Sequence, residues 1–183
     1  LGNGECAVTS FDDDNYLNQD FTTDTSLLNQ SIRELEPNSG TDYNAALITP
    51  MAGGLQISKN GKNKRVIIML TDGQGGGSQK NNIIAEANRQ ECSIYCVTIS
   101  MNAPAILKEI AYKTGGQVYE NVQNLQEIEQ IYHSILHVAQ TGSSCQISWI
   151  SEPRCSPSIT PVELTWKNLT SVDTYTPPSK AVS

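Results

Sequence analysis

The chain has 183 residues, a formal net charge of −7 and only 12 lysine and arginine residues. This length suits one α/β domain with a small remainder. The acidic balance excludes nucleic-acid binding through a basic face, and no apolar run is long enough to span a bilayer.

The cysteines are expected to have two roles, some in a disulfide and others as free thiols. Their number is odd, so at least one is unpaired within the chain. Cys145 and Cys155 bracket a short segment, and we expect a disulfide between them. Cys6 and Cys96 lie in strand-like surroundings, where a free cysteine behaves as a small core residue. A composition rich in Asn, Ser, Thr and Gln but poor in Lys favours an extracellular location.

The first predicted element is a strand over residues 6–11, CAVTSF. It leads into an acidic turn, Asp12-Asp13-Asp14, and residues 18–21 return as a second strand. Three adjacent carboxylates suit a hard cation, but the regular spacing of an EF-hand loop is missing. A solvated loop is the simpler interpretation of this turn.

A helix is predicted next, with Thr25 or Ser26 as its N-cap and apolar positions at 27, 28, 32 and 35. After Pro37, the segment Ser39-Gly40-Thr41 opens a second helix. Two roles for Thr41 remain open at this point. Its hydroxyl either caps that helix or faces a bound cation.

The stretch RVIIMLTDGQGGG, residues 65–77, is the most informative in the chain. Its apolar run at 66–70 has no polar alternation, which is typical of a strand covered on both faces. The run ends at Asp72, and in open α/β sheets ligands bind at the carboxyl ends of strands. Asp72 is therefore either a ligand-binding carboxylate or a turn residue that bonds its own backbone.

Strands and helices alternate from here to residue 140. Helical spacing marks 80–89 and 125–140, and Pro104 suits the first position of a helix between them. Strands are predicted at 93–100 and 117–119. The alternation predicts an α/β fold, a Rossmann-like three-layer sandwich whose central sheet is mostly parallel with helices on both faces.

The composition and residue pattern of the sequence change at Thr141. A linker-like TGSS precedes segments that alternate as exposed strands do. We therefore expect residues 1–140 to form the main domain, and residues 141–183 to be a β-rich segment or the start of a second domain.

Enzyme motifs fit poorly. The glycines at 73, 75 and 77 follow a strand, but the third glycine of a dinucleotide loop would fall at Ser78. His133 and His137 lie on the polar face of the predicted 125–140 helix, away from the strand ends. We expect no catalytic residues and no enzymatic activity, and a nucleotide-binding enzyme is the least favoured function.

Together, CAVTSF, SGTDYNAAL, RVIIMLTDG, IYCVTIS and LKEIAYKTGGQVYENVQNLQEIEQIYHSI resemble, in order, a von Willebrand factor type A domain. The resemblance implies a metal-ion-dependent adhesion site at one edge of the sheet, with Thr41 and Asp72 as ligands. Hydroxyl and carboxylate oxygens suit Mg²⁺, which keeps an open position for a carboxylate of a partner protein.

The chain departs from the family at its start. The family's DxSxS motif, with its first strand and first helix, has no counterpart before CAVTSF. Because that strand is central in the family, we expect another chain or a cleaved fragment to supply it. The alternative is that it belongs to an upstream segment outside this sequence. Without the strand, we expect weak or no Mg²⁺ binding.

These features favour an extracellular or cell-surface adhesion module that recognises a protein. The alternative is a structural or assembly subunit of a cell-surface polymer, in which the metal plays no role.

Overall fold

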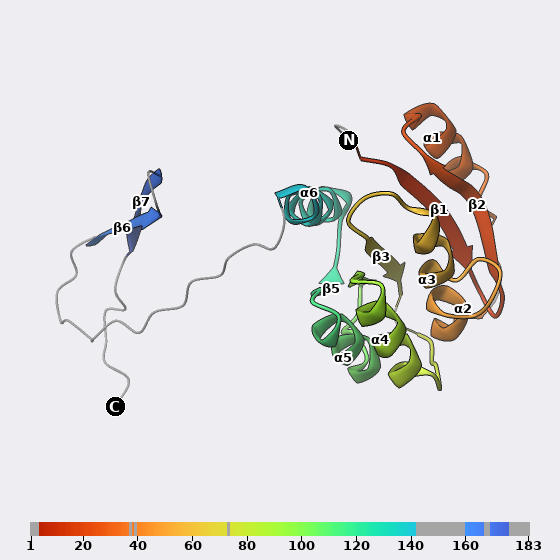
Figure 1. The fold of residues 1–183 in the computed structure, drawn as a ribbon. Coiled ribbons are helices and arrows are strands. Elements are labelled where there is room, and N and C mark those ends of the chain that lie inside the picture. The colour runs from red at the N-terminus through yellow and green to blue at the C-terminus, as the bar shows by residue number, and fades with distance from the viewer. Residues whose placement is uncertain are drawn as a thin grey trace. The chain divides into compact units, whose positions relative to one another are not determined.

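A computed structural model describes residues 4–36, 38, 40–72, 74–141, 160–166 and 169–175 (Figure 1). The chain divides into two compact units, Leu1–Ser144 and Cys145–Ser183. The first contains β1 (Cys6–Phe11), β2 (Asn15–Thr22), α1 (Thr25–Arg33), α2 (Tyr43–Leu47), α3 (Gly54–Ile57), a 3₁₀ turn (Ser58–Asn60), β3 (Val66–Thr71), α4 (Lys80–Arg89), β4 (Ser93–Ile99), α5 (Ala105–Lys113), β5 (Val118–Val122) and α6 (Leu125–Thr141). The second contains the antiparallel hairpin β6 (Thr160–Trp166) and β7 (Leu169–Tyr175). The boundary expected after residue 140 stays a prediction.

A three-stranded parallel sheet, ordered β3-β4-β5, is the centre of the first unit. The side chains of β4 alternate between its faces. Ile94 and Cys96 pack with α2, α4 and α5, whereas Tyr95 and Val97 pack with α6. Both faces of the sheet are therefore apolar. This explains why the run at 66–70 in β3 has no polar alternation, and it confirms the expected α/β sandwich.

The β1–β2 hairpin forms a separate antiparallel sheet. Just before the amino end of β1, the carboxylate of Glu5 accepts a hydrogen bond from the backbone N–H of Lys62. At the other end, the N–H of Asp42 donates to the carbonyl of Asp12 at 2.8 Å. Figure 1 shows β1 and β3 running in the same direction, yet no ladder joins them in the described residues.

Local signals differ from the sequence expectation at two helix starts. Asp24, rather than Thr25 or Ser26, caps α1, because its carboxylate accepts hydrogen bonds from the N–H groups of Ser26 and Leu27. Pro104 is the N-cap of α5 and not its first helical residue. The Asp24 carboxylate satisfies two of the backbone N–H groups that the start of α1 leaves without helical partners.

One residue of β3 is less covered than the apolar run predicts. Leu70 is 43 % exposed, whereas Met69, on the opposite face, is 4 % exposed. The α6 side of β3 is thus incompletely covered near its carboxyl end.

Two cysteine thiols belong to the core. Cys92 and Cys96 are free and almost fully buried, and Cys6 is free and half-buried. Burial raises the pKa of Cys92 to about 11 and that of Cys96 to about 12. The expected pair, Cys145 and Cys155, lies outside the described residues.

The long C-terminal helix of the first unit follows its predicted periodicity. Ile131 and Ile135 are buried, while His133 and His137 are exposed, as the helical spacing predicted. In the portion of the chain with described coordinates, no helix combines the length and apolarity needed to cross a bilayer.

Candidate functional site

Asp72 directly follows β3 at its carboxyl end, and its side chain is exposed. One carboxylate oxygen, Oδ1, accepts a hydrogen bond from the backbone N–H of Gln74 at 3.0 Å. This is the turn role that the sequence left open. A carboxylate has four lone-pair positions, so the turn does not exhaust its capacity to bind a cation.

Thr41 lies in the loop before α2. Its hydroxyl donates to the carbonyl of Gly40 at 2.8 Å, and the carboxylate of Asp42 caps α2 by accepting from the N–H of Asn44 at 2.8 Å. The capping role considered for Thr41 is therefore wrong. Its hydroxyl oxygen serves no helix cap.

The loops that carry these two residues interlock. Asp42 and Gly76 form a parallel bridge. In it, the N–H of Gly76 donates to the carbonyl of Thr41 at 3.3 Å, and the N–H of Tyr43 donates to the carbonyl of Gly76 at 2.7 Å. Thr41 and Asp72 are thus brought to the same end of β3. That they share one cation stays a prediction.

The acidic turn joins the same assembly. Asp12 is buried, and its carboxylate accepts from the N–H of Asp14 at 2.6 Å and from the amide of Asn38 at 2.9 Å. These hydrogen bonds, that from Asp14 first, lower the pKa of Asp12. Asp13 packs so closely on Gly40 that a Cβ there would lie 2.3 Å from its Oδ1. We call residues 12–14, 40–43, 72 and 74–77 the carboxyl-end loops.

The carboxyl-end loops carry uncompensated negative charge. Among the described residues, none of their carboxylates forms an ion pair with lysine, arginine or histidine. Those carboxylates are Asp12, Asp13, Asp14, Asp42 and Asp72. Glu86, Glu109 and Glu120, elsewhere in the same unit, each pair with at least one cation. Such a concentration of one sign of charge attracts counter-ions.

The oxygen donors of the proposed site are of the type that a hard cation prefers, but they are too few to fill its coordination shell. Thr41 and Asp72 offer hydroxyl and carboxylate oxygens, which suit Mg²⁺. The described part of the chain gathers no group of three or more Asp, Glu, His or Cys side chains around a metal position. Water and oxygens from a partner would have to complete the coordination.

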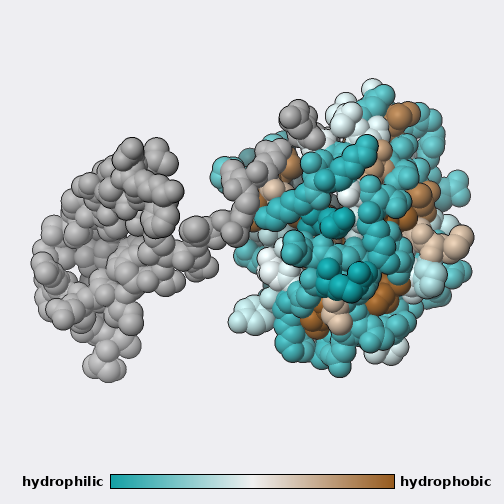
Figure 2. All heavy atoms as spheres, in the orientation of Figure 1, coloured by the Kyte–Doolittle hydropathy of each residue, from teal (hydrophilic) through white to brown (hydrophobic). Residues whose placement is uncertain are grey.

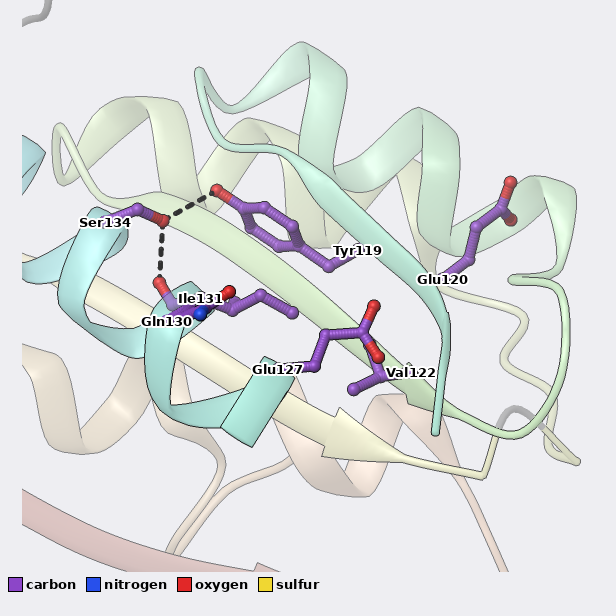
Figure 3. Close-up of a pocket in the computed structure, with 7 residues that line it drawn as sticks. All are labelled: Tyr119, Glu120, Val122, Glu127, Gln130, Ile131 and Ser134. Atoms are coloured by element: carbon purple, nitrogen blue, oxygen red, sulfur yellow. Dashed lines mark hydrogen bonds between the residues drawn. The ribbon is translucent and has the colours of Figure 1, made fainter. Parts of the chain in front are cut away.

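A separate hollow of about 350 Å³ lies between β5 and α6 (Figure 3). Several of its polar groups already have partners: the hydroxyls of Tyr119 and Ser134 lie 3.3 Å apart, and Glu127 accepts from the N–H of Gln123. Glu120 pairs with Lys108. The hollow is remote in sequence from Thr41 and Asp72 and includes neither.

Sequence reasoning missed the residues that hold the loops together. A Cβ on Gly75 would lie 2.5 Å from the Thr41 side chain and 2.8 Å from the Tyr43 ring. The glycines after β3 matched a dinucleotide loop poorly, and in the folded chain Gly75 instead allows the close packing of two loops. The available signal was the glycine cluster itself, since glycine marks close backbone approach.

Comparison with known proteins agrees with this fold. Residues 6–134 match the family model described as von Willebrand factor type A domain. No curated protein sequence matches the chain.

Solved structures are similar in fold at low identity. BatB from Bacteroides thetaiotaomicron is 16 % identical with a TM-score of 0.59, over 76 % of this chain and 82 % of its own. Proximal thread matrix protein 1 from the mussel byssus is 16 % identical with a TM-score of 0.52, over 73 % of this chain and 34 % of its own. The VWA domain of SpRpn10 is 13 % identical with a TM-score of 0.51, over 71 % of both chains.

Proposed function

Because this chain belongs to the von Willebrand factor type A domain family, we propose that it is a non-enzymatic, extracellular protein-binding module. In this proposal, a divalent cation at the carboxyl-end loops, held by Thr41 and Asp72, accepts a carboxylate of the partner protein.

The observation that supports this proposal most directly is that the loop carrying Thr41 and the loop carrying Asp72 meet at one end of the sheet. The carboxylates there form no ion pair with a cationic side chain in the described residues. Thr41 and Asp72 reach that edge from separate parts of the chain, and backbone bonds between Thr41 and Gly76 hold the loops together. Without a cation, these carboxylates repel an acidic partner. A bound Mg²⁺ supplies the positive charge that converts this repulsion into attraction.

The surface of the first unit supports polar rather than apolar recognition. The face shown in Figure 2 is mostly hydrophilic, with hydrophobic residues in separate patches. A broad apolar interface would instead show a contiguous patch.

Calorimetric titration of the 183-residue chain with Mg²⁺ and Mn²⁺ tests the proposal. We expect at most weak binding, because the ligands of the family's first strand are absent from this chain, and Asp72→Ala should abolish it. Asp14→Asn is the matched control, because it removes one charge from the same edge without touching Thr41 or Asp72, and it should bind nearly as well. Equal metal responses in the wild-type protein and Asp72→Ala would reject the site.

The separate β1–β2 and β3–β4–β5 sheets support a second contact in the same proposal. Both β1 and β3 use one edge for pairing within the described residues. An extended segment from another chain or a cleaved fragment would pair with the other edges by β-strand addition. Slower exchange of β3 amides after adding a candidate peptide would support this contact, and unchanged exchange would argue against it.

A structural subunit of a cell-surface polymer is the second candidate. The lack of a three-residue acidic or metal-binding group in the described part of the chain favours a metal-free role. Concentration-dependent assembly that persists in EDTA, as measured by sedimentation, would favour this function over the first.

A further inference from the structure

We propose that Met51, Tyr16 and Asp14 form a docking surface for a segment of a partner protein that carries both apolar and cationic side chains. We call these three residues the Met51 patch. The inference goes beyond the proposed function, because none of the proposed cation ligands belongs to the patch and recognition there requires no metal.

The loop between α2 and α3 presents an apolar side chain on a strained backbone. Met51 is 86 % exposed, more than any other large hydrophobic residue in the described part of the chain. Its φ of 82° lies in the left-handed region, which residues other than glycine rarely adopt. The other described non-glycine residues with positive φ, Glu91, Ser100 and Asn121, are polar. Strain of this kind persists only where neighbouring groups hold it, and it gathers at binding sites.

The neighbouring group that holds this loop is the side chain of Asn15, at the start of β2. Its amide donates to the carbonyl of Ala45 at 3.0 Å and to that of Thr49 at 3.2 Å. Its Oδ1 accepts from the N–H of Ala52 at 3.1 Å. Met51 therefore stands between two anchored residues. A preorganised loop loses little conformational freedom when a partner binds, so more of the contact energy appears as affinity.

The same asparagine brings the start of β2 to the loop. Asp14 precedes it and is exposed, and Tyr16 follows it and is 47 % exposed. The Asp12 carboxylate, then burial and then the Asp14 carboxylate raise the pKa of Tyr16, so its phenol lies within electrostatic reach of this acidic turn. Tyrosine is enriched in the contacts that dominate protein interfaces, and methionine adapts to irregular apolar pockets. The patch thus combines two apolar contacts with negative charge.

Charge selects the occupant of the Met51 patch. In the described residues, the carboxylates of Asp12, Asp13 and Asp14 form no ion pair with a cationic side chain. A lysine or arginine next to an aliphatic or aromatic side chain would complement both parts of the patch. A second copy of this chain fits poorly, because its net charge is −7 and a two-fold interface would bring the same carboxylates together. The occupant is therefore a cationic segment of another protein.

Peptide selection on the full chain tests the proposal. A phage-displayed library of random peptides is selected on the immobilised protein in EDTA, and the enriched peptides are then synthesised and titrated. We expect sequences that combine Lys or Arg with Leu, Ile or Phe. Met51→Gly should bind them roughly tenfold more weakly, as expected for loss of an interface anchor. Because EDTA removes divalent cations, failure of the proposed cation site leaves this result unchanged.

Three further variants separate recognition from folding. Met51→Leu keeps an apolar side chain and should retain most of the affinity. Leu125→Ala is the matched control, because it truncates an 83 % exposed apolar residue on α6, and it should bind as the wild-type protein does. Met51→Gly should melt no earlier than the wild-type protein, since glycine relieves the positive φ. Asp14→Asn should bind severalfold more weakly and with less dependence on salt.

The contrary outcomes are equally definite. Failure to enrich any peptide, or peptides that bind the wild-type protein and Met51→Gly equally well, would overturn the proposal. Sedimentation that shows a dimer of the wild-type protein, dispersed by Met51→Gly, would assign the patch to a second copy instead. If Met51→Gly does not fold, Asp14→Asn decides, because no hydrogen bond to its carboxylate is seen in the described residues. Unchanged affinity in that variant would then reject the cationic partner.

Discussion

Glu86, near the amino end of the parallel sheet, and the aspartates of the carboxyl-end loops differ in their partners. At the amino end, Glu86 pairs with Lys59 at 3.2 Å and Arg89 at 2.7 Å. At the carboxyl end, Asp12, Asp42 and Asp72 accept hydrogen bonds from backbone amides, and none of the aspartates of these loops pairs with a cationic side chain in the described residues. Glu86 therefore has cationic partners, whereas the aspartates of the carboxyl-end loops have none among the described residues.

The difference indicates where a bound cation would be stabilising. At the amino end, Ser58 donates to Gln90 and Gln90 donates to Glu86, so each polar group already has a partner. We call Ser58, Glu86, Arg89 and Gln90 the amino-end network. A cation added there would compete with Arg89, while a cation at the carboxyl end would relieve repulsion.

The largest expected effect comes from forcing the carboxyl-end loops apart. Gly75→Ala places a Cβ 2.5 Å from Thr41, and we expect a loss of about 1–3 kcal/mol, as for other overpacked sites. Gly76→Ala is the matched control, because no atom lies within 4 Å of its Cβ position. Chemical denaturation measures both, and equal stabilities would show that the interlock is looser than described.

The amino-end network gives the next effect. Its ion pairs and the hydrogen bond to Gln90 suggest that Glu86→Gln costs about 1–2 kcal/mol at neutral pH. Glu129→Gln, at a 73 % exposed position on α6, should cost almost nothing. A similar loss in both variants would mean that the network does not stabilise the fold.

The same carboxylate predicts an acid dependence. Hydrogen bonds from Arg89 and then Gln90 lower the pKa of Glu86 from 4.5 to about 2. Because the charged form is favoured in the folded state, its contribution is complete above pH 4.5 and is lost as the pH falls toward 2. The stability difference between the wild-type protein and Glu86→Gln should therefore shrink over this range in denaturation measured at successive pH values.

Asp42 separates hydrogen bonding from charge at the carboxyl end. Asp42→Ala removes the cap of α2 and should cost about 1 kcal/mol. Asp42→Asn keeps an oxygen for the N–H of Asn44 and removes one repelling charge, so it should be nearly neutral. A large loss in the asparagine variant would show that the charge itself is stabilising.

Asp72→Asn should have the smallest effect on stability in EDTA, within roughly 0.5 kcal/mol, as for exposed surface changes. The asparagine oxygen can still accept from Gln74. A clear loss of stability, measured by thermal melting without metal, would assign Asp72 a structural role instead of a ligand role.

Local patterns were enough to predict much of the fold. The apolar run at 66–70 predicted β3, and the spacing of Ile131 and Ile135 predicted α6. These signals are readable because burial on two faces or one stripe leaves a direct period in the sequence. The family resemblance was confirmed by the match over residues 6–134.

The long-range contacts could not be predicted in this way. The bridge between Asp42 and Gly76 joins segments more than 30 residues apart, and no local period encodes such a pairing. Asp72 was readable because it ends a strand, and Thr41 because it follows a glycine before a helix. Tyr43 looked like an ordinary helical residue, since its hydroxyl partner at Gly75 becomes a neighbour only in the folded chain.

The two core thiols give the molecule a built-in reporter of opening. With pKa values of about 11 and 12, Cys92 and Cys96 stay protonated and shielded in neutral solution, so oxidants and alkylating reagents meet almost no thiolate there. An oxidising environment would therefore leave them unmodified as long as β4 and its flanking helices stay packed. Once the sheet separates from these helices, both sulfurs become reactive. Their labelling rate would then measure how often the folded unit opens transiently.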